Sequence, residues 1–337
     1  MLHRRRALQG FAAAAISLPN VARAQAKAEI AISRQPGILY LALHVIEKER
    51  LIEKHAERLG IKGATVKWLS FANGGAQQDA LLAGGVDVVN TGTGQLLLLW
   101  DRTRGGVKGI AASCAPPLTF VTRDPRIQSL KDLGQSDKIA VPTVKISTQA
   151  LLLQIAATDM FGVEQWNHFD PLTVQLGHPD AFVAMKNPVH EVRNHFGAPP
   201  FDFYELKEIQ GARKITDSTS IIGGRLTQGQ FFTTTRFAES NPKFVEAVAA
   251  AARDAKAAIE SDLPRAVEAY RELNNDKTPT EILVELLSRP GFADWNLYPQ
   301  GTMKIAMHLH RIGTLKTRPA SWKDYYLPYA HDTGAGS

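Results

Sequence analysis

Apolar and polar positions alternate with two different periods along the first part of the chain. Residues with period two, or in short continuous apolar runs, predict strands at 29–33, 64–71 and 86–90. Between them, apolar residues spaced three and four apart predict a long amphipathic helix at 38–59 and a shorter one at 77–83. Strands that alternate with helices are typical of βαβ units, so we expect an α/β fold with mostly parallel sheets.

The same alternation continues along the chain and predicts a second α/β set. A helix is expected to open at Thr91-Gly92-Thr93-Gly94 and to run through Trp100. The further predicted strands are 107–112, 118–123, 138–141, 172–176, 191–196, 212–216 and 230–235. The further predicted helices of this part are 129–133, 147–161 and 179–185.

The C-terminal third of the chain has helical spacing and two helix-start patterns. Asn241-Pro242 is an N-cap residue followed by proline at the first helical position, and it predicts a helix that runs to Ile259. Thr278-Pro279-Thr280-Glu281 has the spacing of a capping box. Helices, rather than further strands, are therefore expected to complete the fold.

The N-terminal residues 1–24 read as an export signal. Arg4-Arg5-Arg6 forms a charged start, 11–18 is a short apolar run, and Ala22-Arg23-Ala24 fits the small-x-small cleavage rule. The apolar run is far shorter than the roughly 20 residues that span a bilayer. The arginines resemble a twin-arginine signal; an ordinary secretory signal and a dispensable basic arm are the alternatives. We therefore expect a protein exported to the periplasm.

Removing the export signal lowers the positive charge of the chain. The sequence has 39 Lys and Arg against 33 Asp and Glu, but four arginines and no acids lie in residues 1–24, which leaves 35 against 33. No concentrated basic stretch remains, so no nucleic-acid partner is expected. The length of 337 residues suggests two domains. The single cysteine, Cys114, excludes an intrachain disulfide.

Polar and small residues follow several predicted strands, where open α/β sheets bind their ligands. Gln35 follows the first strand, and Thr91-Gly92-Thr93 follows the third. Ser147 and Thr148 follow the strand at 138–141 and open a helix. The free N–H groups and partial positive charge of a helix N-terminus hold an anion without a full positive charge. A simple N-cap role for Ser147 is the alternative.

The Thr91-Gly92-Thr93-Gly94 turn lets a ligand approach the backbone, because glycine has no side chain. A dinucleotide fingerprint would need a third glycine at position 97, which is Leu97. The sequence therefore excludes a dinucleotide site here. It leaves ligand contact and a mere tight turn as open alternatives.

Six short motifs follow one another in order along the chain. They are Pro36-Gly37-Ile38-Leu39-Tyr40, Gly74-Gly75 with 79–87, Ser129-Leu130-Lys131-Asp132-Leu133, 141–150, His178-Pro179-Asp180-Ala181, and 195–201. Together they resemble the nitrate/sulfonate/taurine class of ABC-transporter solute-binding proteins, over nearly the whole chain after the signal. The resemblance implies the type II periplasmic-binding-protein fold, α/β with two lobes joined by a two-strand hinge.

The resemblance, together with two expected chain crossings, implies a discontinuous domain arrangement. One crossing is expected at Pro116-Pro117 and the other within 230–235. Domain 1 would comprise 25–114 plus 232–337, and domain 2 would comprise 115–231. A discontinuous first domain that closes over an inserted second one makes the two-strand hinge.

The resemblance implies a binding protein and not an enzyme. Such a protein captures a small anionic or polar solute in the periplasm and delivers it to the transmembrane permease subunits of an ABC importer, which a cytoplasmic ATPase drives. A monomer without cofactor is expected. Nitrate, alkanesulfonates, taurine, aromatic carboxylates and pyrimidines stay open as ligands, because the loop 145–149 replaces the more glycine-rich loop of sulfonate binders.

The resemblance also adds site residues. It implies that His195 lies at the cleft in domain 2, and Tyr40 is the matching candidate in domain 1. A hydrogen-bonded structural role for His195 and a core position for Tyr40 are the alternatives. Two arginines, Arg34 and Arg193, are expected at solvated surface positions rather than on the ligand. Lys145 is expected nearer the site, with a solvated loop position as the alternative.

Two rival functions, a metal-binding protein and an enzyme, would depend on histidines and on the single cysteine. His168, His178, His190 and His195 lie close together in sequence, but His190 and His195 are five residues apart and do not match a zinc-protease helix. No metal site is therefore expected. Enzymes of the same fold, desulfinase-like or thiamine-pyrimidine-synthase-like, would offer Cys114 as nucleophile, but a buried structural cysteine is expected there.

Overall fold

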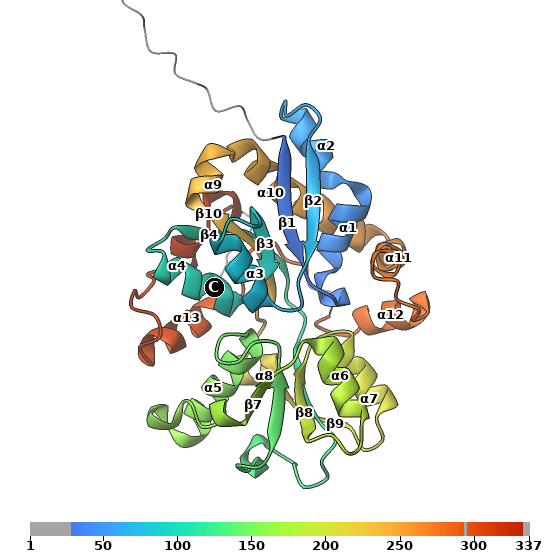
Figure 1. Ribbon diagram of the computed structural model, residues 1–337, viewed down its shortest axis with the longest axis vertical. Coiled ribbons are helices and arrows are strands. Elements are labelled where there is room, and N and C mark those ends of the chain that lie inside the picture. Colours follow the sequence, from blue (N-terminus) through green and yellow to red (C-terminus); the bar gives the residue numbers. More distant parts are fainter. Residues whose placement is uncertain (1–27, 293–294, 333–337) are drawn as a thin grey trace, which may run out of the picture.

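The computed structural model describes residues 28–292 and 295–332, and the expected export signal at 1–24 lies outside this part of the chain. The described residues form two α/β lobes, one above the other in Figure 1, each built on a five-stranded sheet with helices packed against it. This arrangement confirms the predicted two-lobed α/β fold.

The first sheet has the strand order β2-β1-β3-β10-β4. Its strands are β1 (Glu29–Arg34), β2 (Thr65–Ser70), β3 (Val88–Thr91), β4 (Val107–Cys114) and β10 (Gly229–Thr234). β1 pairs in parallel with β2 and β3, whereas β10 runs antiparallel to β3 and β4. Phe231 and Phe232 of β10 are fully buried, so this returning strand lies in the core of the lobe.

The second sheet has the strand order β7-β6-β8-β5-β9. Its strands are β5 (Thr119–Thr122), β6 (Lys138–Val141), β7 (Thr173–Gln175), β8 (Val192–Gly197) and β9 (Arg213–Asp217). β6 pairs in parallel with β7 and β8, whereas β5 runs antiparallel to β8 and β9. The buried rings of Phe120 on β5 and Phe196 on β8 pack edge to face across this sheet.

Four of the five strands in each sheet run in the same direction, as predicted, but each sheet also contains one strand that runs against both of its neighbours. These strands are β5 and β10, and each is the first strand that the chain forms after passing from one lobe into the other. When the chain enters a sheet at the end where the neighbouring strands finish, the new strand must run in the opposite direction to them. Hydrophobic periodicity reports which residues are buried but carries no information on strand direction.

Helices cover both faces of the first sheet (Figure 1). The helices of this lobe are α1 (Leu41–Glu49), α2 (Leu51–Arg58), α3 (Gly74–Leu82), α4 (Thr93–Arg102), α9 (Thr235–Ser240), α10 (Pro242–Ser261), α11 (Leu263–Asn274), α12 (Thr280–Leu287) and α13 (Thr302–Arg311). The single helix predicted at 38–59 was wrong. The observed segment starts as a 3₁₀ turn, and its helix is interrupted at Arg50, whose φ of 53° is left-handed. Apolar spacing continues through the break, so the pattern alone hides it.

The second lobe carries α5 (Thr148–Phe161), α6 (His178–Lys186), α7 (Phe201–Glu208) and α8 (Ser218–Ile222). Tyr204 of α7 reaches the first lobe, where its hydroxyl lies 2.7 Å from Oγ1 of Thr278. The capping box predicted at Thr278 was therefore wrong: Pro279 is the N-cap residue of α12, without a side-chain cap. The Thr278 hydroxyl is hydrogen-bonded to Tyr204 of the other lobe and does not cap α12.

Two chain segments join the lobes. One connects β4 to β5, and the other connects α8 to β10. The two segments lie side by side, since the Gln228 N–H donates to the Cys114 carbonyl over 2.9 Å. The Ser218 N–H likewise donates to the Leu118 carbonyl over 2.9 Å. The exact division of the chain into domains at 114/115 and 231/232 stays a prediction.

Candidate functional site

A small cavity of about 30 Å³ lies between the two lobes, beside the joining segments. A buried water needs roughly 10–15 Å³ on this measure, so the cavity holds about two waters or one small ion. Its wall is formed by Gln35, Leu39, Tyr40, Gly74, Thr91, Gly92, Gln95, Leu118, Pro142, Ser147, Thr148, Gln149, His178 and Gln228. Six of the eight residues proposed from the sequence are on this wall: Gln35, Tyr40, Thr91, Gly92, Ser147 and Thr148.

Four helices begin at the cavity wall. Gly74 is the first residue of α3, Gly92 is the N-cap of α4, Ser147 is the N-cap of α5, and His178 is the first residue of α6. Each N-terminus offers unpaired N–H groups and about half a positive charge. Within the described ranges 28–292 and 295–332, the wall contains no Lys, Arg, Asp or Glu. The cavity is thus electropositive without a charged side chain.

Glycine allows the two lobes to touch at the cavity. A Cβ on Gly92 would lie 2.8 Å from Oγ1 of Thr148, which belongs to the other lobe. A Cβ on Gly94 would overlap the Ile146 carbonyl oxygen, again across the lobes. Both contacts are closer than a side chain tolerates, so these glycines are needed for the closed arrangement seen here.

Gln35, Tyr40 and Thr91 form a hydrogen-bonded group on the first-lobe side of the cavity. The Gln35 amide donates to the Tyr40 hydroxyl over 2.8 Å and to the Thr91 hydroxyl over 3.1 Å. Burial raises the pKa of Tyr40 well above its usual value, so its hydroxyl stays protonated. Since that oxygen already accepts from Gln35, the Tyr40 hydrogen is available as a donor.

Several buried polar atoms on the wall have no hydrogen-bond partner. They are Oγ1 of Thr148, Oε1 of Gln95, and both amide atoms of Gln228. These three side chains are at most 4% exposed. Ser147, by contrast, accepts from the Ala150 N–H over 3.3 Å and keeps its own hydrogen for donation. Unpaired buried polar groups are costly, so the cavity is built to hold a polar occupant.

His178 is the one imidazole on the wall, and the sequence search missed its role. The Gln149 amide nitrogen donates to its Nε2 over 3.2 Å, and its Nδ1 lies 2.9 Å from Nε2 of His195. Burial, together with the neighbouring His195, holds the pKa of His178 well below its usual range, so the ring is neutral at pH 7.

Thr93 and His195 are the two proposed site residues that do not reach the wall. The Thr93 hydroxyl donates to the Thr227 carbonyl over 2.8 Å, which ties α4 to a joining segment. His195 is fully buried behind His178, with its Nδ1 2.6 Å from Oε1 of Glu205. Thr93 therefore supports the hinge side of the cavity, and His195 acts on it only through His178.

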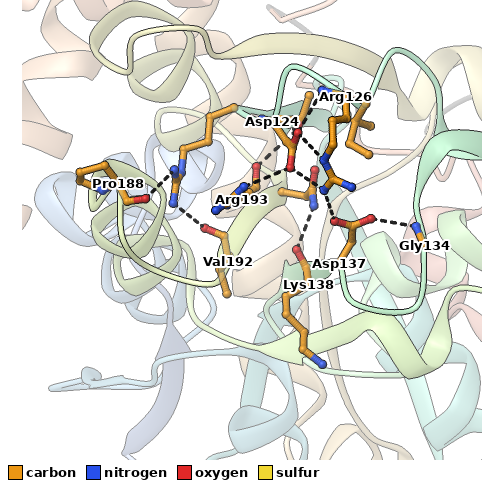
Figure 2. Close-up of polar contacts among 12 residues, drawn as sticks. Asp124, Arg126, Gly134, Asp137, Lys138, Pro188, Val192 and Arg193 are labelled. Carbon is orange, nitrogen blue, oxygen red and sulfur yellow. Dashed lines mark hydrogen bonds and ion pairs between the residues drawn. The ribbon is translucent and has the colours of Figure 1, made fainter.

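The nearby cations lie away from the cavity wall. Arg34 forms a bidentate pair with Glu47, at 2.6 and 2.8 Å. Arg193 lies 3.4 Å from Asp124, in a cluster that Figure 2 shows together with Arg126 and Asp137. We call these four residues, Asp124, Arg126, Asp137 and Arg193, the ionic edge. Hydrogen bonds from Arg126 hold the pKa of Asp124 down at about 2, so this carboxyl is ionised at pH 7.

The third cation, Lys145, has a left-handed backbone φ of 67° and lies beside a different groove, which Asp170 also lines. Larger hollows of about 360 and 510 Å³ open elsewhere on the molecule. Neither is lined by any of the strand-end residues Gln35, Thr91 or Ser147. The small cavity, not the larger hollows, is therefore where strand ends and helix starts meet.

Leu39, Gly74, Gln95, Leu118, Pro142, Gln149 and Gln228 also line the cavity although the sequence did not single them out as ligand contacts. His178 follows a strand and starts a helix, so the rule that selected Ser147 would also have selected it. Gln228 lies in a joining segment between strands, where no periodic pattern points to a site.

No helix in the described part of the chain is long and apolar enough to cross a membrane. The same residues contain no cluster of three or more His, Cys, Asp or Glu side chains placed to hold a metal ion.

Comparison with known proteins places the fold but not the ligand. No family model matches the chain, and no curated protein matches it. The alkanesulfonate-binding protein SsuA from Xanthomonas axonopodis pv. citri, bound to MOPS, superposes with a TM-score of 0.67 at 18% identity, over 88% of this chain and 96% of that one. The aliphatic sulphonate-binding protein SsuA from Escherichia coli gives 0.65 at 17% identity, over 89% and 92%.

The nitrate-binding protein NrtA from Synechocystis PCC 6803 superposes with a TM-score of 0.62 at 14% identity, over 88% of this chain and 84% of that one. These similarities confirm, at the level of the fold, the resemblance expected from the six motifs. The chain has the fold of periplasmic binding proteins, with the cavity at the junction of its two lobes.

Proposed function

We propose that this protein is the periplasmic solute-binding component of an ABC importer and that it captures a small inorganic or organic anion between its lobes. The observation that carries the proposal is the cavity wall, where four helix N-termini meet buried donors and no charged side chain among the described residues. Such a site balances one negative charge without holding it so tightly that release fails.

The proposed ligand bridges the lobes and thereby favours closure. Tyr40 and the start of α4 approach from the first lobe, and Ser147 with Thr148 approaches from the second. Only a ligand that contacts both sides stabilises the closed form over the open form. The close approach of Gly92 to Thr148 lets these donors surround a small ion.

The size of the cavity favours the smallest of the ligands that the sequence leaves open. About 30 Å³ accommodates an ion such as nitrate. Taurine, longer alkanesulfonates and aromatic carboxylates would need the lobes to close less completely. We therefore place nitrate first among the ligands to be tested.

The proposed partners follow from the same role. After export by the signal at 1–24, the protein would work in the periplasm as a monomer without cofactor. Its closed form would dock on the transmembrane permease subunits, and a cytoplasmic ATPase would drive release and transport. The structural neighbours are periplasmic binding proteins for sulfonates and nitrate, which supports this assignment.

An enzyme of the desulfinase type is the weaker alternative. Its candidate nucleophile, Cys114, is 1% exposed at the end of β4 and is not on the cavity wall. A thiol that cannot reach the ligand cannot attack it.

The proposal is tested by a thermal-shift screen of the full chain against nitrate, methanesulfonate, taurine and benzoate, followed by calorimetry. We expect nitrate to bind with a Kd that is roughly micromolar. Ser147→Ala should weaken it about 10- to 100-fold, because a hydrogen bond to a charged group is worth about 1.5–3 kcal/mol.

The matched control is Thr234→Ala. Thr234 caps α9 by accepting from the Phe237 N–H, as Ser147 caps α5, but it is not on the cavity wall. Both substitutions should lower the free energy of unfolding by about 1 kcal/mol. Equal affinities in the two variants would remove Ser147 from the site, and no response to any of the four anions would reject the proposed ligand class.

A further inference from the structure

A second hollow, of about 510 Å³, lies between the lobes and away from the small cavity. Its walls come from α5 and α8 of the second lobe and from α13 and the segment after it in the first lobe, and they include Ile155, Asp159, Ile221, Lys304, Arg311 and Arg318. Figure 1 shows α13 above α5 at this place. We call this hollow the α13 groove. It shares no lining residue with the small cavity, and small-molecule sites have a similar volume of roughly 300–1,000 Å³.

A hydrogen bond joins the two walls of the α13 groove. Nζ of Lys304 donates to the Ile222 carbonyl over 2.7 Å. Lys304 lies on α13 of the first lobe, and Ile222 is the last residue of α8 in the second lobe. Because the partners belong to different lobes, the groove has this shape only in the closed arrangement. An occupant that contacts both walls therefore stabilises the closed form over the open form.

The wall from the first lobe carries an excess of positive charge. It holds Lys304, Arg311 and Arg318, whereas Asp159 is the carboxylate that the second lobe contributes, which leaves two positive charges on these four side chains. Among the described residues, the guanidinium groups of Arg311 and Arg318 form no hydrogen bond and no ion pair. These two forks are therefore free to bind an anion from solution.

His308 of α13 adds a buried polar group to the same wall. Its side chain is 8% exposed, and its Nε2 has no hydrogen-bond partner in the described part of the chain. Burial, together with the nearby Arg311, lowers the pKa of His308 to about 4, so the ring is neutral at pH 7. An unpaired buried polar group is costly, so this wall is suited to a polar occupant.

The wall from the second lobe is largely apolar. Ile155 of α5 and Ile221 and Ile222 of α8 line it, and both Ile155 and Ile221 are only half-buried. The Thr158 hydroxyl donates to the Gln154 carbonyl over 3.0 Å, so it has no hydrogen left for an anion. The first-lobe wall thus fits an anionic group, and the second-lobe wall fits an apolar body.

We propose that the α13 groove is a second binding site, for an organic anion with two negative charges at one end and an apolar body at the other, and that its occupation strengthens capture of the anion in the small cavity by favouring closure. The arginine forks match the oxygens of a phosphate group or of paired carboxylates. Binding at the groove is independent of the proposed function, whereas its coupling to the small cavity rests on that function.

Helix α5 connects the two sites. It begins at the cavity wall with its N-cap Ser147 and reaches the groove at Ile155, about 12 Å further along at about 1.5 Å per residue. An occupant that holds the groove end of α5 in the closed position also holds Ser147 and Thr148 against the small cavity. By thermodynamic linkage, the anion in the cavity must strengthen binding at the groove by the same factor.

The first test is calorimetry of the full chain with phenyl phosphate, a dianion with one apolar ring. Phenyl phosphate should bind, and the double variant Arg311→Gln with Arg318→Gln should weaken that binding about five- to tenfold, which is what two exposed charge pairs contribute. The matched control is Arg236→Gln with Arg253→Gln, which changes the charge equally at exposed positions outside both sites and should bind as the wild type does.

The second test measures the coupling, by titrating nitrate with and without saturating phenyl phosphate. Phenyl phosphate should strengthen nitrate binding about fivefold or more, and the double arginine variant should lose most of this effect at the same concentration. Inorganic phosphate has a similar charge but no apolar body, so it contacts only the first-lobe wall and should leave nitrate affinity unchanged.

Absence of phenyl phosphate binding, or equal binding by the wild type and the double arginine variant, overturns the inference. Unchanged nitrate affinity in phenyl phosphate overturns the coupling, as does an equal gain with inorganic phosphate, and weaker nitrate affinity would mean that both anions compete for the small cavity. If no anion binds in the small cavity but phenyl phosphate binding still depends on Arg311 and Arg318, the proposed function fails and the groove stands as a binding site.

Discussion

Asp124 and Glu205 are two buried carboxyl groups of the second lobe whose surroundings shift their pKa values in opposite directions. The Asp124 side chain is 1% exposed, and its pKa falls to about 2 because Arg126 and Arg193 donate to it. Glu205 is fully buried against an imidazole alone, and its pKa rises. Asp124 lies under two partly exposed arginines, whereas Glu205 lies deep in the lobe, so depth and charged neighbours together decide the charge.

The surroundings of these two carboxyl groups meet on the single strand β8. Arg193, at the ionic edge, and His195, the partner of Glu205, are two residues apart on β8. The ionic edge uses full charges that solvent reaches, since the Arg126 and Arg193 side chains are 61% and 49% exposed. The cavity uses neutral donors and helix ends where solvent is excluded. The cavity thus lacks the strong ion pairs that hold the ionic edge together.

The largest loss of nitrate affinity is expected when a charged side chain is placed in the cavity, which now has neutral donors only. In Gln95→Glu, a carboxylate would stand where Oε1 of Gln95 now lacks a partner, near the start of α4. Two like charges about 4 Å apart repel by about 4 kcal/mol at an effective dielectric constant near 20, which is about 1000-fold in affinity. Nitrate calorimetry measures the loss. Gln128→Glu, at an exposed position, makes the same charge change and should leave affinity intact.

Removing the charge of Asp124 should affect stability rather than binding. We expect Asp124→Asn to lower the free energy of unfolding by about 2 kcal/mol at pH 7, because charged hydrogen bonds to Arg126 are lost. The folded pKa of about 2 lies below the unfolded value near 3.9, so this contribution is full above pH 4 and disappears as the pH falls toward 2. Urea unfolding at several pH values tests this.

Asp202 supplies the matched opposite case. Burial raises its pKa to about 7, above the unfolded value, so its ionisation opposes folding increasingly from about pH 4 to 7 and in full above pH 7. Asp202→Asn should therefore stabilise the protein relative to the wild type at pH 7 and lose that advantage at pH 4. If Asp124→Asn and Asp202→Asn changed the free energy of unfolding at pH 7 in the same direction, the surroundings of the two carboxyls would not decide their charge.

The smallest effect is expected at Arg193. Its guanidinium lies 3.4 Å from Asp124 and is half exposed, and such pairs contribute about 0.2–1 kcal/mol. Arg193→Ala should shift the free energy of unfolding by less than about 1 kcal/mol and leave nitrate affinity unchanged. A clear loss of affinity in calorimetry would mean that the ionic edge affects binding in the cavity, contrary to the expected independence of the two regions.

Sequence reasoning located much of the fold and part of the candidate site. The strand at 138–141 matches β6, and Ser147 is the N-cap of α5. It missed the break at Arg50, because one left-handed residue leaves the apolar spacing unchanged. It also chose His195 over His178, since both histidines sit in motifs and only contacts between elements show which one faces the cavity.

The sequence by itself determined the local features of this protein. Strand ends and N-caps depend on residues a few positions apart, so periodicity and cap chemistry predict them. The tertiary structure alone decided which helix starts face one another, which strands run backwards, and which carboxyls are ionised. Those properties depend on burial and on partners from distant elements, such as Glu205 for His195 and Thr148 for Gly92, and a linear pattern carries neither.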